Sequence, residues 1–275
     1  MLGTVTRLRR YPVKSMLGED VPHSDVDAAG LTHDRRLALI HTGTGKVASA
    51  KNPRTWRALP TLSAAVRDDS VRITFPDGMS IPAADPAADE ALSAFLGQPV
   101  RLTSASPEGA TLDRAVPEEV LRAGVTAEVP VKVITMADLS PAGTFFDFVP
   151  LHVLTSSTLA EIAAHSPSGT ADVERYRPNI VIDTLSPGFT ENDWYERDLR
   201  IGADLVIRVV CRTPRCAIPT LQHGPLPRDP EALRVLAKRN RVVPMGGASP
   251  EPCAGVYATI VHPGLIRTGD PVRFI

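Results

Sequence analysis

Proline and glycine residues divide this chain into many short segments. There are 26 prolines and 19 glycines among its 275 residues, and they are spread along the whole sequence. Both residue types favour turns, so we expect many short elements joined by turns. Apolar and polar residues alternate in several segments, for example in residues 4–9 and 71–75. A period of two is typical of strands with one buried face, and the sequence therefore predicts a β-rich fold of the α+β class.

Boundary signals locate the expected elements. A hairpin is expected between residues 36–40 and 46–50, and another at the turn Pro76-Asp77-Gly78. Asp85, which a proline follows, should begin a helix that ends at Gly97. Further strands are expected at residues 100–103, 131–135, 179–182, 199–212 (with a break at 202–204), 256–261 and 270–274, and further helices at 118–122, 155–165 and 229–239.

A polar segment separates two strand-rich parts. Residues 105–130 contain several prolines and glycines and no long apolar run, which predicts a loop or linker around the short helix expected there. We therefore expect one domain at residues 1–110 and a second at residues 125–275. Closing a sheet into a barrel would remove the exposed edges that so many short strands create.

The overall charge argues against two classes of partner. The formal net charge is −1, which gives no support to binding of nucleic acid or of a membrane surface. No apolar run approaches the ~20 residues of a membrane helix. The first residues lead directly into an alternating strand pattern without the apolar core of a signal peptide. The expected location is the cytoplasm.

Three cysteines, Cys211, Cys216 and Cys253, limit the possible thiol chemistry. A disulfide framework would use more, and an iron–sulfur cluster needs four thiolates. Cys216 follows an expected strand directly after Arg215, and positive charge favours a thiolate. The C-x-x-x-x-C spacing of Cys211 and Cys216 is unusual for zinc. A metal ligand, a nucleophile and a buried apolar thiol all stay open for Cys216 at this point.

Two other motifs suggest anion binding. Tyr11-Pro12-Val13-Lys14-Ser15 places an ammonium and a hydroxyl side by side after a strand, although a solvated loop lysine is the simpler interpretation. Arg175 and Arg177 should point to the same side of an extended segment and could hold a phosphate, or form a basic patch on an edge strand. For Arg35, the simplest interpretation of the sequence is a surface ion pair with the neighbouring Asp34.

The order of these motifs resembles the MOSC family, whose members are similar to the C-terminal part of molybdenum cofactor sulfurase. The resemblance covers nearly the whole chain and is closest to the N-hydroxylated-compound reductases, which include the mitochondrial amidoxime-reducing component. The motifs that carry it are YPVKS at 11–15, GL and DR at 30–35, RYRPNIVI at 175–182, ENDW at 191–194, RC at 215–216, and PG with GDPV at 263–272.

The resemblance implies an N-terminal MOSC-associated β-barrel-like domain followed by a MOSC β-barrel domain with a few short helices. It implies a molybdenum–molybdopterin cofactor, with Cys216 as the catalytic residue and metal ligand. Residues 146–149 should lie near the pterin. Pro214 departs from the small hydroxyl residue that is common there. The residues implied to bind the cofactor are Lys14, Ser15, Arg35, Arg177, Tyr257 and Arg215.

The implied function is a molybdenum-dependent oxidoreductase that reduces small N-hydroxylated compounds. The chain ends directly after the GDPV strand, so a separate ferredoxin-like or flavoprotein-like electron donor is expected. A carrier of molybdenum cofactor or of sulfur, without reductase activity, is the alternative, and an anion-binding scaffold without metal is a third hypothesis. Asp147, Asp183 and Asp193 are candidates for a general acid.

Overall fold

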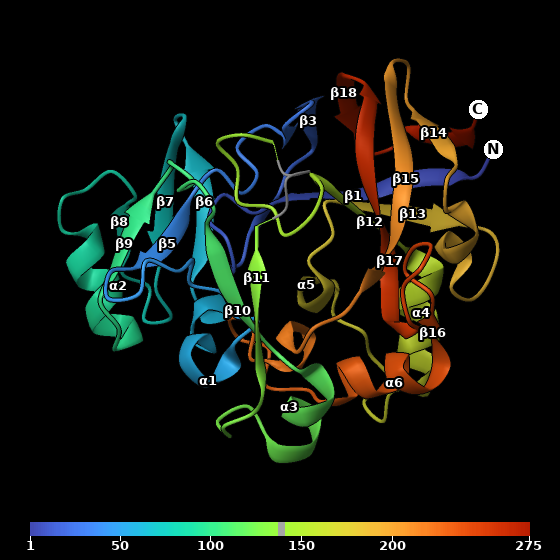
Figure 1. Ribbon diagram of the computed structural model, residues 1–275. Coiled ribbons are helices and arrows are strands. Elements are labelled where there is room, and N and C mark those ends of the chain that lie inside the picture. Colours follow the sequence, from blue (N-terminus) through green and yellow to red (C-terminus); the bar gives the residue numbers. More distant parts are fainter. Residues whose placement is uncertain (137–140) are drawn as a thin grey trace.

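The chain folds into a β-rich structure with a few short helices (Figure 1), which confirms the predicted fold class. A computed structural model describes residues 1–136 and 141–275. The strands are β1 (Gly3–Arg10), β2 (Glu19–Asp20), β3 (His23–Asp27), β4 (Gly30–Leu31), β5 (Ala38–His41), β6 (Ser63–Arg67), β7 (Ser70–Thr74), β8 (Ser80–Pro82), β9 (Val100–Thr103), β10 (Thr111–Ala115), β11 (Val131–Thr135), β12 (Leu151–Thr155), β13 (Ile180–Thr184), β14 (Asp198–Ile201), β15 (Leu205–Pro214), β16 (Arg241–Val242), β17 (Glu251–His262), β18 (Gly264–Arg267) and β19 (Pro271–Phe274). The helices are α1 (Pro53–Trp56), α2 (Ala88–Leu96), α3 (Pro117–Ala123), α4 (Ser156–His165), α5 (Val173–Tyr176) and α6 (Glu231–Arg239), and single 3₁₀ turns lie at Leu59–Thr61, Thr190–Trp194 and Ile218–Thr220.

Seven strands form a closed barrel. The sheet runs β12-β13-β1-β19-β14-β15-β17, and pairing of β17 with β12 closes it. All neighbours are antiparallel except β12 and β13. The first strand of the chain thus belongs to the same barrel as strands from the last 125 residues or so, pairing with β13 and β19. Because β17 pairs with β12, the two outer strands of the sheet have no exposed edge there. This agrees with the expectation that the sheet closes into a barrel.

Alternating apolar residues fill the barrel. Val5 on β1, Ile182 on β13, Leu199 on β14 and Ile207 on β15 are buried together in one cluster. Trp194 of the ENDW motif joins them with 2% of its surface exposed, so it is the packing residue that the sequence suggested. Helices α4 and α6 contact each other on the outside of the barrel. The side chain of Thr155 accepts a hydrogen bond from the backbone N–H of Thr158, and it caps α4 as predicted.

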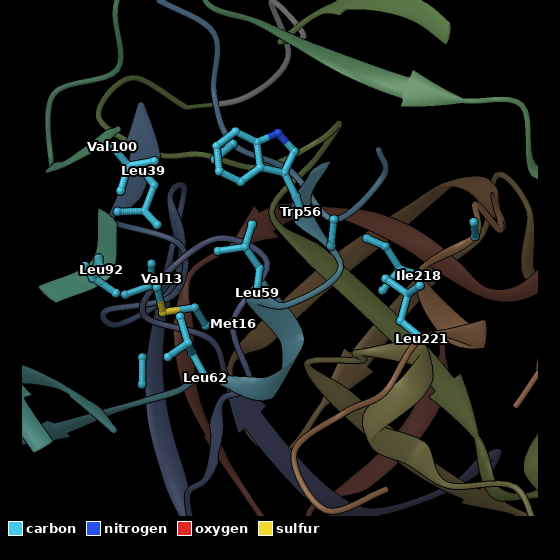
Figure 2. Close-up of a cluster of buried hydrophobic side chains, with 14 of the residues drawn as sticks. Val13, Met16, Leu39, Trp56, Leu59, Leu62, Leu92, Val100, Ile218 and Leu221 are labelled. Carbon is cyan, nitrogen blue, oxygen red and sulfur yellow. The ribbon is translucent and has the colours of Figure 1, made fainter. Parts of the chain in front are cut away.

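The N-terminal part has its own apolar core, which reaches across to a later segment (Figure 2). Trp56 and Leu59 belong to this cluster together with Leu62, which directly precedes the three-stranded sheet β6-β7-β8. Ile218 and Leu221, which follow β15 of the barrel, are buried in the same cluster. The chain directly after Cys216 is therefore anchored in the core of the N-terminal part, and it connects the two halves of the molecule.

Three local predictions were wrong. Residues 46–50 form no strand, because β5 pairs with β9 and meets this segment only through an isolated bridge at Val47. Helix α2 begins at Ala88 rather than at Asp85. The expected linker contains β10, whose Leu112 is fully buried, so burial overrides the polar composition there. Strand β10 pairs with β11 as a two-stranded ribbon between the two parts (Figure 1). The domain limits at 110 and 125 stay a prediction.

Within residues 1–136 and 141–275, no helix has the length and apolar character needed to cross a bilayer.

Candidate functional site

A cavity of about 330 Å³ is lined by residues from both parts of the chain. Residues from the YPVKS motif, from the ribbon β10-β11 and from the barrel strands β15 and β17 face it. All seven residues that the resemblance placed in a cofactor site lie on this cavity, namely Cys216, Lys14, Ser15, Arg35, Arg177, Arg215 and Tyr257. Folding thus brings together residues that are up to 243 positions apart in the sequence (14 to 257).

Three of these residues have an unusual backbone. Ser15, Arg35 and Arg177 adopt positive φ angles of 66°, 49° and 56°. Residues other than glycine rarely adopt this region, which costs about 1–3 kcal/mol at such a site, and such strain gathers at functional sites. Arg35 is held there by its N–H, which donates to the carbonyl of Tyr11 at 2.8 Å. Arg177 terminates the short helix α5 in this conformation. The fold therefore stabilises a strained backbone at three separate points of one cavity.

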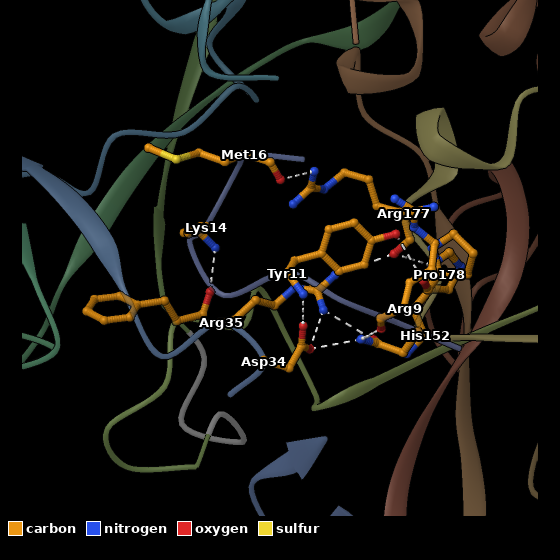
Figure 3. Close-up of polar contacts among 11 residues, drawn as sticks. Arg9, Tyr11, Lys14, Met16, Asp34, Arg35, His152, Arg177 and Pro178 are labelled. Atoms are coloured by element: carbon orange, nitrogen blue, oxygen red, sulfur yellow. Dashed lines mark hydrogen bonds and ion pairs between the residues drawn. The ribbon is translucent and has the colours of Figure 1, made fainter. Parts of the chain in front are cut away.

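Tyr11 organises two of the guanidinium groups (Figure 3). The Cζ atoms of Arg35 and Arg177 lie 4.6 and 4.4 Å from the centroid of its ring, one from each half of the chain. Its hydroxyl donates to the carbonyl of Pro178 at 3.0 Å, and its ring is fully buried. A cation near an aromatic face is attracted by the ring quadrupole. Arg177 also donates from Nη1 to the carbonyl of Met16 at 2.6 Å, which fixes its direction.

A buried carboxylate supports the same arrangement. Asp34 has no exposed surface, and it accepts hydrogen bonds from the N–H of Tyr11 at 2.6 Å and from Nδ2 of Asn179 at 2.9 Å. It also forms an ion pair with Arg35 (Figure 3). The ion pair with Asp34 is therefore a buried structural element, and the surface interpretation of Arg35 was wrong.

Two lysines, Lys14 and Lys51, share the carboxylate of Asp147. Together with Arg35 and Arg177, they form what we call the cationic end of the cavity. Lys14 Nζ lies 2.6 Å from Oδ1 of Asp147, and Lys51 Nζ lies 3.1 Å from Oδ2. Burial lowers the pKa of Lys14 to about 8. Burial alone would raise the pKa of Asp147, but the two lysines outweigh burial and hold that pKa well below its usual range. Asp147 is thus an ionised acceptor near neutral pH and is unsuited to act as a general acid.

Cys216 lies two residues after the end of barrel strand β15 and belongs to the apolar core of the N-terminal part. The N–H of Arg215 donates to the carbonyl of Pro252 on β17 at 2.8 Å, and Ala217 after it is fully buried. This fixes the position of Cys216, whose surface is 8% exposed. Cys211 also lines the cavity, but burial raises its pKa to about 11. Burial raises the pKa of Cys253 to about 12, so neither of these thiols forms a thiolate near neutral pH.

The donors around the cavity fit an anionic ligand. Six cationic side chains line it against two carboxylates, Asp147 and Glu251. Arg215 donates from Nη2 to the carbonyl of Tyr176 at 2.8 Å, but its Nε is buried without a hydrogen-bond partner among the described residues. An unpaired buried N–H costs about 1–3 kcal/mol unless a ligand satisfies it. The six cationic side chains that line the cavity are Lys14, Arg35, Lys51, Arg114, Arg177 and Arg215.

Aromatic side chains form another wall of the cavity. Tyr257 on β17 pairs in register with His152 on β12 and with Cys211 on β15. Its ring centroid lies 5.9 Å from that of Phe148 and 5.6 Å from that of His152. Burial raises the pKa of Tyr257, which keeps its hydroxyl neutral. Of residues 146–149, Asp147 and Phe148 line the cavity, whereas Phe146 and Val149 are buried and do not line it; their proximity to a pterin stays a prediction.

Arg175 is not part of this site. It lies in helix α5 rather than in an extended segment, with an ion pair to Asp172 at 3.0 Å. It donates to the carbonyls of Leu221 and Pro227 at 3.0 and 2.8 Å, so it holds the chain after Cys216 in place. The expectation that Arg175 and Arg177 point to the same side was wrong because the helix turn separates them. Neither an edge-strand basic patch nor a shared phosphate fork forms here.

Comparison with known families gives the affiliation of the chain. The sequence model of the MOSC domain matches residues 143–273, and that of the MOSC N-terminal beta barrel domain matches residues 2–112. The chain belongs to the MOSC family. It is 26% identical over 291 residues to mitochondrial amidoxime reducing component 2 of Macaca fascicularis, with 98% of this chain and 83% of that protein covered. It is 26% identical over 305 residues to mitochondrial amidoxime-reducing component 1 of Homo sapiens, with 100% of this chain and 83% of that protein covered.

Two solved structures are also similar to this MOSC protein. The YuaD protein from Bacillus subtilis is 10% identical and superposes with a TM-score of 0.47, over 99% of this chain and 94% of that one. YiiM from Geobacillus stearothermophilus is 17% identical with a TM-score of 0.32, over 46% of this chain and 53% of that one.

The MOSC sequence motifs did not indicate several cavity residues. His152, Lys51, Arg114 and Glu251 come from segments without a motif, and only the fold brings them to the cavity. For His152 the sequence offers just a histidine in a continuous apolar strand, Leu151–Thr155. The other two general-acid candidates, Asp183 and Asp193, are exposed and do not line the cavity.

His152 supports the strained backbone of this MOSC site. Its Nδ1 lies 3.3 Å from the carbonyl of Arg177, and its Nε2 lies 3.1 Å from the carbonyl of Ala254. Burial and the nearby Arg215 lower its pKa to about 3, so the ring is neutral near neutral pH. A neutral imidazole donates from one nitrogen only, so His152 holds one of the two carbonyls by a full hydrogen bond.

We expect the buried histidines to make the fold acid-sensitive. Burial lowers the pKa of His152 and of His223 to about 3 in the folded chain, against 6.5 when exposed. The unfolded chain then binds more protons as the pH falls below 6.5, so the free energy of unfolding should decrease by about 1.4 kcal/mol per pH unit for each histidine. Urea unfolding between pH 7 and 4.5 measures this slope. His223→Gln should reduce it, and a matched change of the exposed His23 should not; equal slopes in the two variants would contradict the assignment.

Proposed function

We propose that this chain binds the molybdenum cofactor in the cavity and reduces N-hydroxylated compounds with electrons from a separate donor protein. The observation that carries the proposal is the convergence of the Cys216 thiol and six cationic side chains on one cavity. Membership of the MOSC family supports cofactor binding. The names of the relatives, amidoxime reducing components, support the reaction.

The residues present suit the two chemical ends of such a cofactor. A phosphate is matched by lysine and arginine, and Lys14, Arg35 and Arg177 lie together beside Tyr11 and Asp147. Sulfur-bound molybdenum is soft and prefers a thiolate, which Cys216 can supply. Among the described residues, no group of three or more His, Cys, Asp or Glu side chains could hold a metal ion.

When bound, the cofactor would supply two-electron redox and oxygen-atom-transfer chemistry. For an amidoxime the balance is two electrons and two protons taken up, the N–O bond broken, and an amidine and water released. The chain itself positions the reactants. Arg35 and Arg177 are fixed by Tyr11 and Asp34, and the rings of Tyr257 and Phe148 form one wall of the cavity. The two electrons come from the separate ferredoxin-like or flavoprotein-like donor, and the cytoplasmic location belongs to the same proposal.

The first experiment measures the amounts of molybdenum and pterin bound per chain. Protein purified from a host that makes the cofactor should contain molybdenum and pterin in equal amounts, about one of each per chain, and should reduce N-hydroxybenzamidine with a chemical reductant. Protein with neither metal nor pterin would overturn the proposal. Equal amounts without turnover would favour the carrier, and cyanide-labile sulfur on Cys216 without molybdenum would favour sulfur transfer.

A further inference from the structure

The two carboxylates of the cavity differ in how far they are neutralised. Each oxygen of Asp147 faces one lysine, so this carboxylate is fully paired. Glu251 has a single long contact, from Nη2 of Arg114 to its Oε2 at 3.4 Å. Within the part of the chain that the structure describes, no hydrogen bond reaches its Oε1. The side chains of Arg114 and Glu251 are 25% and 39% exposed, so water reaches the pair and a ligand can replace the contact.

Glu251 lies beside the segment that carries Cys216. It begins β17, and the next residue, Pro252, accepts the hydrogen bond from the N–H of Arg215 at 2.8 Å. The residue after that, Cys253, pairs in register with Pro214. The carboxylate is therefore on the strand that runs along the Cys216 segment. Lys14 and the arginines that contact Tyr11 form a different group around Asp147 and Asp34.

Apolar side chains line the same cavity as Glu251. Pro214 lines the cavity from β15, and Pro244, Met245 and Ala248 line it from the segment that joins β16 to β17. Val242 of β16 pairs with Glu251, which places this segment next to the carboxylate. Apolar walls with one acceptor suit a small molecule that has an apolar body and an N–H donor.

The contact with Arg114 shows which donor this carboxylate accepts. A guanidinium is a planar N–C–N group with N–H bonds, and an amidine or amidoxime has the same planar N–C–N unit. At 3.4 Å the bond from Arg114 is long for a charge-assisted hydrogen bond, so a ligand with the same geometry can compete for Glu251.

We propose that Glu251, together with the apolar wall of Pro214 and Met245, is a substrate subsite that selects amidoximes over hydroxamic acids. This inference rests on the proposed function. An amidoxime carries an amino group on the carbon beside the N–OH nitrogen, and that group donates to the carboxylate. A hydroxamic acid carries a carbonyl oxygen there, whose lone pairs would face the carboxylate without a hydrogen bond. A site whose acceptor hydrogen-bonds a substrate N–H favours that substrate over an analogue that lacks the donor.

The test compares N-hydroxybenzamidine with benzhydroxamic acid, which share the phenyl ring and the N–OH group. In holoenzyme carrying Glu251→Gln, the ratio of kcat/KM for the amidoxime over the hydroxamic acid should fall roughly tenfold, as expected for one charge-assisted hydrogen bond. Benzamidine binding, measured by calorimetry, should weaken by a similar factor. Arg114→Gln should tighten benzamidine binding by roughly threefold, because a competing donor and a like charge are removed.

Glu118→Gln is the matched control, since Glu118 is exposed and pairs with Arg241 outside the cavity. It should leave the ratio and the benzamidine affinity unchanged. The inference is overturned if Glu251→Gln changes both substrates equally, or if benzamidine binds the variant as well as the unaltered protein. Failure of the proposed function looks different: the unaltered protein then lacks molybdenum or turns over neither substrate, whereas benzamidine binding still reports on Glu251.

Discussion

Replacing Cys216 by serine is expected to remove molybdenum from the purified protein while leaving the fold intact. Serine has nearly the same volume, so the core that anchors Ala217 and Ile218 should be retained, with a change in unfolding free energy within about 1 kcal/mol. A serine hydroxyl stays protonated at neutral pH and is a hard ligand, which a sulfur-bound metal disfavours. We expect molybdenum content and reductase activity to fall by at least ~100-fold, more than loss of a supporting residue causes.

The same substitution at Cys211 provides the control. Cys211 lines the same cavity, but burial raises its pKa to about 11, and its Sγ lies 2.9 Å from the carbonyl of Arg212. A serine there can make the same hydrogen bond. Cys211→Ser should therefore keep its molybdenum, measured by plasma emission spectrometry, and its activity. Full molybdenum in Cys216→Ser, or equal losses in the two variants, would contradict the ligand role of Cys216.

Pterin content adds a second measurement to this pair. The cationic group of Lys14, Arg35 and Arg177 is unchanged in Cys216→Ser, and these side chains are fixed by Asp147, Tyr11 and Asp34. A variant that keeps pterin and loses metal would therefore separate the two ends of the cofactor. The measurement is fluorescence of the oxidised pterin released from the protein.

The order of short motifs was enough to predict the family and the seven proposed site residues. Lys14 and Ser15 follow a strand and a proline, and Cys216 follows an alternating strand next to Arg215, so local patterns made them candidates, and the family resemblance supplied their implied roles. Strand β9, the cap of α4 by Thr155 and the packing role of Trp194 were also predictable, because the signals for each lie within a few residues.

What the sequence did not predict depends on contacts between distant segments. Residues 46–50 alternate as a strand would, but β5 finds its partner in β9, about 60 residues on. Arg114 reaches the cavity because the buried Leu112 turns a polar segment into a ribbon strand. The left-handed backbone of Arg177 has no local signal, since its stability comes from distant residues, Tyr11 directly after β1 and His152 on β12. Such residues can be identified as part of the site only when the register of the sheet is known.

Glycine at position 255 is the clearest case of such a long-range requirement, and Gly255→Ala should be strongly destabilising. Gly255 has a φ angle of 80°, and an added Cβ would lie 2.3 Å from Nε2 of His152 and 2.6 Å from the carbonyl oxygen of Val153. The N–H of Gly255 donates to the buried Glu191 at 3.0 Å, so the backbone cannot move away without breaking that bond. Strain of about 1–2 kcal/mol and overpacking of about 1–3 kcal/mol should together lower the free energy of unfolding by about 2–5 kcal/mol.

Gly78→Ala separates the two causes. Gly78 has a similar φ of 90° in the turn before β8, and nothing lies within 4 Å of the added Cβ. It should lose only the strain, about 1–2 kcal/mol, in urea unfolding monitored by circular dichroism. Equal losses at the two positions would show that the close approach of β17 to His152 contributes nothing. A larger loss at Gly255, accompanied by lower cofactor content, would show that His152 transmits the disturbance to the carbonyl of Arg177, the residue whose guanidinium lies over Tyr11 at the cationic end of the cavity.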